Sequence, residues 1–173
     1  FPDQFPETKV LAFSSAGAQP RFFLTYPYRD YRTNHDRLIF GVSNDDPRLP
    51  RKDRVLGVAI GSAAKAYPIA GFGSGTNVVG DHVGGESIVV VGNAERNFAA
   101  GYLHPLGEDG LPLEFTPVAD DGRAVMADGE GNRWDLFGVA VDGPRAGERL
   151  ASPEGSYIAY WFAWTGFNPE TER

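Results

Sequence analysis

The stretch "DRVLGVAIGSAAKAYPIAGF", residues 53–72, predicts two β-strands that pair as a hairpin. Apolar and small residues alternate through residues 54–60, which is the period-2 pattern of a strand. Gly61–Ser62 interrupts the pattern, and glycine favours a two-residue turn because it adopts positive φ without a Cβ clash. On the return strand we expect Tyr67 to pack inward. Pro68 should end the ladder because proline has no N–H to donate.

Similar short apolar runs, bounded by Gly, Asp, Asn or Pro, recur about every ten residues. They comprise residues 9–13, 21–26, 37–42, 87–92, 98–103, 111–118, 123–127 and 133–141. This spacing is typical of an antiparallel sandwich or barrel. We therefore predict a mainly β, single-domain fold, an antiparallel β-barrel or sandwich with short helical or irregular segments.

We expect the domain to span residues 1–173, with a loop-rich N-terminal extension at 1–50 and a core at 51–171. Residues 152–167 open with Ser-Pro-Glu, which is a reasonable start for a helix. Their aromatic and β-branched content equally favours a terminal strand.

The composition excludes several classes of function. The chain has 173 residues, a net charge of −7 and no cysteine. A nucleic-acid groove would need a basic stripe, and without cysteine there is no disulfide, thiolate zinc site or cysteine nucleophile. No apolar run approaches the roughly 20 residues of a membrane-spanning helix. The start at Phe1, followed by a loop-like segment, is compatible with a cleaved signal or anchor, so we expect an exported, periplasmic or otherwise extracytoplasmic protein.

Four polar residues form a candidate site: Asp81, His82, Arg96 and His104. Imidazole and carboxylate groups could bind a metal or move protons, and a guanidinium could hold an anion. Adjacent residues of a strand face opposite ways, so Asp81 and His82 would need a turn to cooperate. The spacing is not that of a metal motif, and we assign no metal, cofactor or catalytic residue.

Aromatic residues gather near the C-terminus, among them Tyr160, Trp161 and Trp164. Exposed aromatic patches usually mark contacts with partners, so these residues are candidates for partner binding. The alternative is a lid that packs over one end of the fold. A further alternative is a small-ligand pocket lined by Tyr67, Trp134 and Trp161.

Several short motifs carry a family resemblance. They are the stretch ending in Lys65-Ala66-Tyr67-Pro68, Asp81 with Gly84-Gly85-Glu86, Met126, Asp128, Trp134, residues 143–150, and Trp161 and Trp164 before Asn168. In order and spacing they resemble the bacterial family known as domain of unknown function 3179, over about residues 50–171.

Members of this family usually have a His-Glu pair where this chain has Thr76 and Asn77. They also have a Cys-Pro-Leu-Cys-like element whose cysteines fall at Asn93 and Arg96 here. The resemblance thus implies a divergent copy that lacks the natural carriers of any metal, redox or thiol activity. It also implies export, because members often look envelope-associated.

We therefore expect a non-catalytic exported β-domain that acts as a binding or assembly module. It would be an accessory subunit of a larger cell-envelope or membrane-associated complex, with a protein partner and no nucleic acid. The alternative is a metal- or small-ligand-binding enzyme that uses Asp81, His82 and His104.

Overall fold

The computed structural model describes Glu7, Lys9 and residues 27–173. The chain divides into two compact units, Phe1–Ile39 and Phe40–Arg173. In the first unit, the 3₁₀ helix η1 (Arg29–Arg32) is followed by a turn in which Asn34 and Arg37 donate to the Asp30 carboxylate, at 3.1 and 2.8 Å. The strand expected at 21–26 lies outside the described residues, as does the strand expected at 9–13 apart from Lys9.

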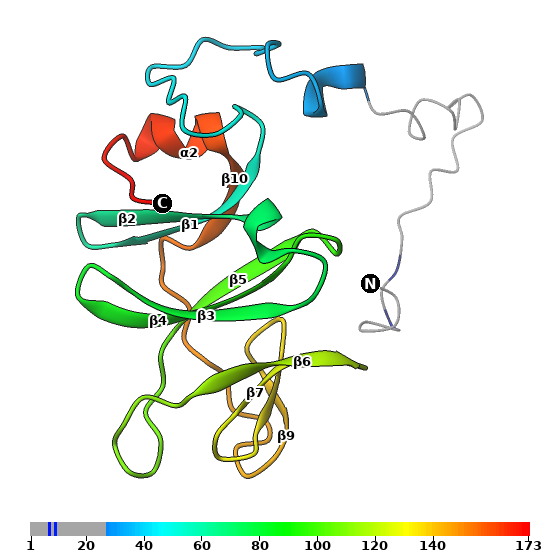
Figure 1. Ribbon diagram of the computed structural model, residues 1–173, viewed down its shortest axis with the longest axis vertical. Coiled ribbons are helices and arrows are strands. Elements are labelled where there is room, and N and C mark those ends of the chain that lie inside the picture. The colour runs from blue at the N-terminus through cyan, green and yellow to red at the C-terminus, as the bar shows by residue number, and fades with distance from the viewer. Residues whose placement is uncertain (1–6, 8, 10–26) are drawn as a thin grey trace. The chain divides into compact units, whose positions relative to one another are not determined.

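The second unit is built from three antiparallel sheets, which Figure 1 shows with helix α2 (Trp161–Phe167). The first sheet has the order β10 (Tyr157–Tyr160), β1 (Arg54–Ile60) and β2 (Ala63–Pro68). The second has the order β3 (Asn77–Val83), β4 (Glu86–Asn93) and β5 (Phe98–Leu103). The third has the order β6 (Phe115–Asp121), β7 (Ala124–Asp128), β8 (Arg133–Asp135) and β9 (Ala140–Asp142).

The prediction of a mainly β fold is confirmed, and the arrangement is a layered sandwich. Within the described residues no sheet closes into a barrel. The hairpin at residues 53–72 forms with Leu56 opposite Tyr67 and Ile60 opposite Ala63. Tyr67 is buried, and after Pro68 the chain turns into the 3₁₀ helix η2 (Ile69–Phe72).

Strand β4 forms the middle of the sandwich because both of its faces are buried. Ile88 and Val90 pack in a cluster with side chains of the first sheet. Val89 and Val91 pack in a second cluster with side chains of the third sheet. A strand enclosed on both faces reads as a continuous apolar run, as "SIVVVG" does.

Helix α2 covers the outer face of the first sheet through a third cluster, formed by Val55, Ala66, Trp161 and Trp164. Gly57 permits this contact, because a Cβ at that position would lie 2.2 Å from the Trp164 ring. Residues before β1 join the same cap. Trp161 Nε1 donates to the Asp46 carbonyl oxygen at 2.9 Å, and Asp46 belongs to the second unit.

Several local expectations differ from the structure. The strand expected at 111–118 begins only at Phe115 and runs to Asp121 as β6. Residues 37–42 form no strand; Ile39 and Phe40 are exposed and lie where the two units divide. Residues 133–141 form two strands instead of one, because a turn at Gly138, with φ of 72°, separates β8 from β9. Residues 152–167 contain a terminal strand, β10, followed directly by α2; the helix begins at Trp161 and not at the Ser-Pro-Glu start expected at residues 152–154.

Candidate functional site

A cluster of Lys65, Tyr67 and Asp81 joins the first sheet to the second. Lys65 and Tyr67 are two residues apart on β2, so their side chains leave the same face of the strand. The Tyr67 hydroxyl donates to Asp81 Oδ2 at 2.9 Å, and Lys65 Nζ lies 2.8 Å from the same oxygen. One carboxylate of β3 thus accepts from two donors of β2.

The surroundings of Asp81 favour its charged form. Partial burial acts to raise the pKa of Asp81, but hydrogen bonds from Lys65, the His82 N–H and Tyr67 outweigh it and lower the pKa. Burial, together with the bond to Asp81, raises the pKa of Tyr67 well above its usual value. Tyr67 is therefore a neutral hydrogen-bond donor at physiological pH rather than a base.

The other predicted polar residues do not join this cluster. His82 leaves the opposite face of β3, and its Nε2 lies 3.0 Å from Ser87 Oγ. His104 hydrogen-bonds through Nε2 to the Leu113 carbonyl oxygen and packs against the Phe115 ring. Arg96 lies in the turn that follows Asn93 at the end of β4, whereas Ser87, the neighbour of His82, lies near the start of that strand.

The structure thus distributes Asp81, His82, Arg96 and His104 over different places. Among the residues that the structure describes, no group of three or more His, Asp or Glu side chains is arranged to hold a metal ion. In the same part of the chain, no helix has the length and apolar character needed to cross a membrane.

The tryptophans singled out in the sequence are core residues. Trp134, Trp161 and Trp164 are at most 1% exposed. Each indole N–H has an internal acceptor: Asp128 Oδ2 for Trp134, the Asp46 carbonyl for Trp161 and Thr171 Oγ1 for Trp164. A partner or ligand could touch these rings only if they left the core. Trp134 and Trp161 also lie in different clusters, apart from Tyr67, so the three do not line one pocket.

The half-buried Tyr160 stacks on Phe162, with ring centroids 6.0 Å apart. The more exposed aromatic residues of this segment are Tyr157 and Phe167, at 46% and 83%. The two buried tryptophans of this segment therefore pack as a lid over the first sheet. The aromatic side chains exposed at the surface of this segment, Tyr157 and Phe167, are not among the predicted site residues.

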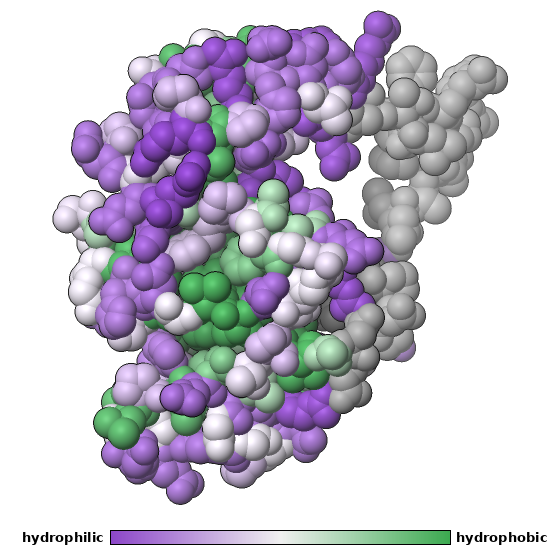
Figure 2. All heavy atoms as spheres, in the orientation of Figure 1, coloured by the Kyte–Doolittle hydropathy of each residue, from purple (hydrophilic) through white to green (hydrophobic). Residues whose placement is uncertain are grey.

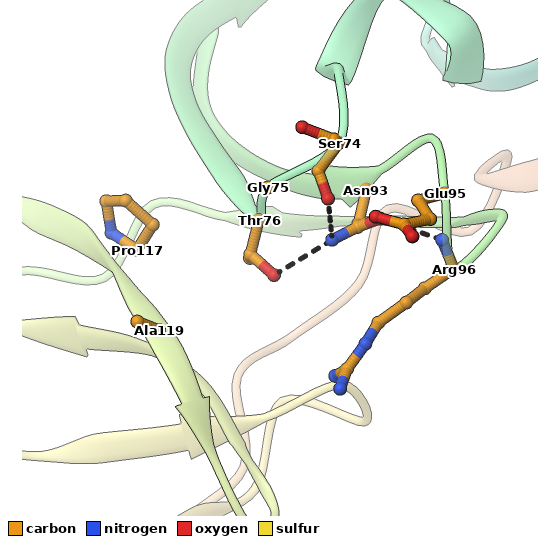
Figure 3. Close-up of a pocket in the computed structure, with 8 residues that line it drawn as sticks. All are labelled: Ser74, Gly75, Thr76, Asn93, Glu95, Arg96, Pro117 and Ala119. Carbon is orange, nitrogen blue, oxygen red and sulfur yellow. Dashed lines mark hydrogen bonds between the residues drawn. The ribbon is translucent and has the colours of Figure 1, made fainter.

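A polar pocket of about 470 Å³ lies between the second and third sheets, and Figure 3 shows its residues. It is lined by Ser74, Gly75, Thr76, Asn93, Glu95, Arg96, Pro117 and Ala119. Three segments meet here: the loop before β3, the turn after β4, and β6.

Asn93 holds the first two of these segments together. Its Nδ2 donates to the Ser74 carbonyl oxygen at 3.2 Å and lies 3.5 Å from Thr76 Oγ1, while its Oδ1 accepts the Arg96 N–H at 2.8 Å. A main-chain bond from Ala94 to Gly73, at 2.9 Å, reinforces the same junction. The rim of the pocket is thus fixed by its own hydrogen bonds.

Sequence reasoning missed this pocket as a site, although it drew attention to three of its positions. Thr76, Asn93 and Arg96 stand where the family resemblance places histidine and cysteine, and the fold brings all three together. Their departure from the expected pattern was the available signal. Nothing in the sequence indicated that Pro117 and Ala119 line the pocket, because their position depends on how β6 packs against the second sheet.

Comparison with known proteins identifies the family. The model of the family described as "Protein of unknown function (DUF3179)" matches residues 1–171, and the chain belongs to this family. No curated protein and no solved structure matches the chain.

Proposed function

We propose that this member of the DUF3179 family is a non-catalytic, extracytoplasmic binding domain, an accessory subunit of a larger cell-envelope assembly. In this proposal it recognises a polar group of its partner in the pocket between the second and third sheets. The observation that carries the proposal is the convergence of Thr76, Asn93 and Arg96 around that pocket.

The chemistry of these side chains suits recognition. A threonine hydroxyl becomes a nucleophile when an adjacent base removes its proton, but the group beside Thr76 Oγ1 is the Asn93 amide, which is not a base. The amide is itself engaged with Ser74 and Arg96. Polar groups held in fixed positions around a concave site provide orientation and specificity for a bound group.

The assembly role is supported by the surface as well as by the pocket. Large apolar side chains such as Val79 and Tyr157 are more than two-fifths exposed. Val79 lines an apolar pocket together with Phe72 and Val78, and an exposed apolar recess is typical of a contact surface. Export is supported by the family resemblance.

Site-specific photo-crosslinking in the native host tests the proposal. A photoreactive amino acid replaces Glu95, which is exposed at the rim of the pocket, or Glu148, an exposed residue near the opposite edge of the third sheet. We expect one discrete crosslinked protein in the envelope fraction from the probe at Glu95. The probe at Glu148 should yield none.

A charge-reversing Arg96→Glu change, combined with the probe at Glu95, should reduce the crosslinked product at least tenfold while the melting temperature changes little. Equal crosslinking from both probe positions, or none from either, would contradict the proposal. A stoichiometric metal ion in purified protein that is lost on His82→Ala substitution would contradict its non-catalytic part.

A further inference from the structure

Strand β3 ends its sheet with main-chain groups turned outward. The pairing of β3 with β4 runs through the two-residue turn Gly84–Gly85, which makes Val83 and Glu86 the first hydrogen-bonded pair. In an antiparallel ladder such pairs alternate with pairs whose N–H and C=O groups face away. The outward residues of β3 are therefore Val78, Gly80 and His82.

The His82 N–H confirms this alternation, because it donates to Asp81 Oδ1 at 2.8 Å instead of to β4. The Asp81 carboxylate thus occupies the outward N–H at the end of β3 that lies nearest the turn. In the part of the chain that the structure describes, the main chain of Val78 and Gly80 forms the remaining open edge of β3, which β6 approaches; Gly80 is exposed and Val78 is half-buried.

Several other sheet edges of the second unit are covered or interrupted by the chain itself. The Ala66 N–H on β2 donates to Glu172 at 2.9 Å, Leu103 on β5 donates to Ala151 at 2.8 Å, and Ala140 on β9 donates to Glu148 at 2.9 Å. Strand β6 carries Pro117, which cannot donate. Proteins cover or interrupt edges in these ways because an open edge pairs with other chains.

An apolar pocket lies beside the open edge. It has a volume of about 420 Å³ and is lined chiefly by Tyr67, Pro68, Phe72, Val78 and Val79. Val79 is 41% exposed and faces the side of the sheet on which Tyr67 lies. Figure 2 shows hydrophobic residues gathered over the middle of this view, where Figure 1 shows β3.

We propose that β3 receives an extended segment of a partner protein as an additional strand. The segment pairs with the main chain of Val78 and Gly80 and places one apolar side chain in the pocket beside Val79. This inference rests on the proposed function and names where and how the partner binds.

The occupant follows from hydrogen-bond complementarity. The open groups of Val78 and Gly80 alternate donor and acceptor and repeat every two residues, about 7 Å, which matches the repeat of another extended chain. In strand addition the main chain provides affinity, and pockets for alternate side chains provide specificity. A helix has its main-chain groups bonded internally and cannot supply this pattern.

Two substitutions of Gly80 separate the main-chain contribution from the side-chain contribution. Gly80→Ala keeps the outward N–H and fits, because the nearest atom to a Cβ there is His104 Cε1 at 4.0 Å. Gly80→Pro removes that N–H and places a ring on the open edge, a position that sheets tolerate because the lost N–H is not in the ladder. Melting curves of both variants report whether the fold is kept.

Selection from a displayed library of random ten-residue peptides supplies the probe. We expect the selected peptides to share one apolar position and to bind the wild-type chain and Gly80→Ala equally, while Gly80→Pro loses at least tenfold in affinity. If Gly80→Pro fails to fold, N-methylation of the selected peptide makes the same test. Two peptides are compared, one methylated at the odd-numbered amides and one at the even-numbered amides, and we expect only one of the two to lose binding. Amide exchange at Val78 and Gly80 should slow when the peptide is bound.

Equal binding of the peptides to Gly80→Ala and a folded Gly80→Pro would overturn the inference. So would failure to select any peptide while the probe at Glu95 still crosslinks a partner, a result that leaves the proposed function standing. A dimer of the chain that Gly80→Pro dissociates would overturn it in favour of a second copy as the occupant.

Discussion

Asp81 and Asp128 are both carboxylates with several hydrogen-bond donors, but they gather those donors in different ways. Asp128 is 8% exposed and accepts bonds from the N–H groups of Glu130 and Asn132, the Asn132 amide and Trp134 Nε1. All of these donors lie within six residues. The side chain of Asp81 is 25% exposed, and two of its donors, Lys65 and Tyr67, come from another sheet.

The difference shows what each carboxylate contributes. Asp128 completes one turn and fixes the indole that fills the core beside it, so its loss affects a single closed network. Asp81 links two layers near the surface, where water competes for the same groups and reduces the value of each contact. We therefore expect a large stability effect at Asp128 and a small, pH-dependent one at Asp81.

The largest effect is expected for Asp128→Ala. The change leaves the Trp134 and Asn132 donors buried without their acceptor, at a cost of about 1–3 kcal/mol for each group. Urea unfolding followed by tryptophan fluorescence should show a loss of about 3 kcal/mol or more. The matched control is Asp142→Ala, since Asp142 is exposed and, among the described residues, its carboxylate accepts from the neighbouring Gly143 N–H. Similar losses of unfolding free energy for Asp128→Ala and Asp142→Ala would show that the buried network of Asp128 has no special weight.

Trp134→Phe should destabilise the protein by about 2 kcal/mol, because it removes the indole N–H and leaves a small cavity in a fully buried site. A double-mutant cycle with Asp128→Ala measures the coupling between the two side chains. We expect a coupling of about 1 kcal/mol or more; additive losses would show that Asp128 does not act through Trp134.

Asp81→Asn should cost only about 1 kcal/mol at pH 7, as expected for a partly exposed ion pair. The pKa of Asp81 is lowered on folding, so its contribution is complete above its unfolded pKa of about 4 and is lost as the pH falls through the folded value. Stability curves of the wild type and the variant should therefore converge below about pH 4. A constant difference across that range would show that charge is not involved.

Tyr67→Phe should have the smallest effect, about 0.5 kcal/mol, the low end for a single hydrogen bond, since it keeps the buried ring. Folding raises the pKa of Tyr67, so the contribution of the neutral phenol holds below its unfolded pKa of about 10 and is lost as the pH rises further. Thermal melts at neutral pH and above pH 10 should show the gap between the two proteins narrowing. An unchanged gap would argue that the hydroxyl contributes nothing specific.

Local signals predicted the local parts of this structure. The hairpin at residues 53–72 follows from alternation and a glycine turn, and both depend on neighbours in the sequence. The Asp81 cluster could not be predicted in the same way, because Lys65 and Tyr67 meet Asp81 only after two sheets pack. The i, i+2 spacing of Lys65 and Tyr67 showed a shared face but not what that face would contact.

The aromatic segment illustrates a second limit. Trp161 and Trp164 were candidates for partner contact because so many rings could not all lie under one small sheet. The sequence did not reveal that residues before β1 also cover the helix, with the Arg48 guanidinium 5.3 Å from the Trp161 ring centre. Burial of these rings depends on segments more than a hundred residues apart, and no periodicity reports such a contact.

The position of β10 in the first sheet also bears on the order in which the protein folds. Arg54 of β1 pairs with Tyr160 of β10, about a hundred residues later, while β3, β4 and β5 pair with their neighbours in sequence. Sequence-local hairpins of the second and third sheets can form while the chain is still being synthesised. The first sheet stays incomplete until β10 and the segment around Glu172 have been synthesised, so an emerging chain remains open at one face until then.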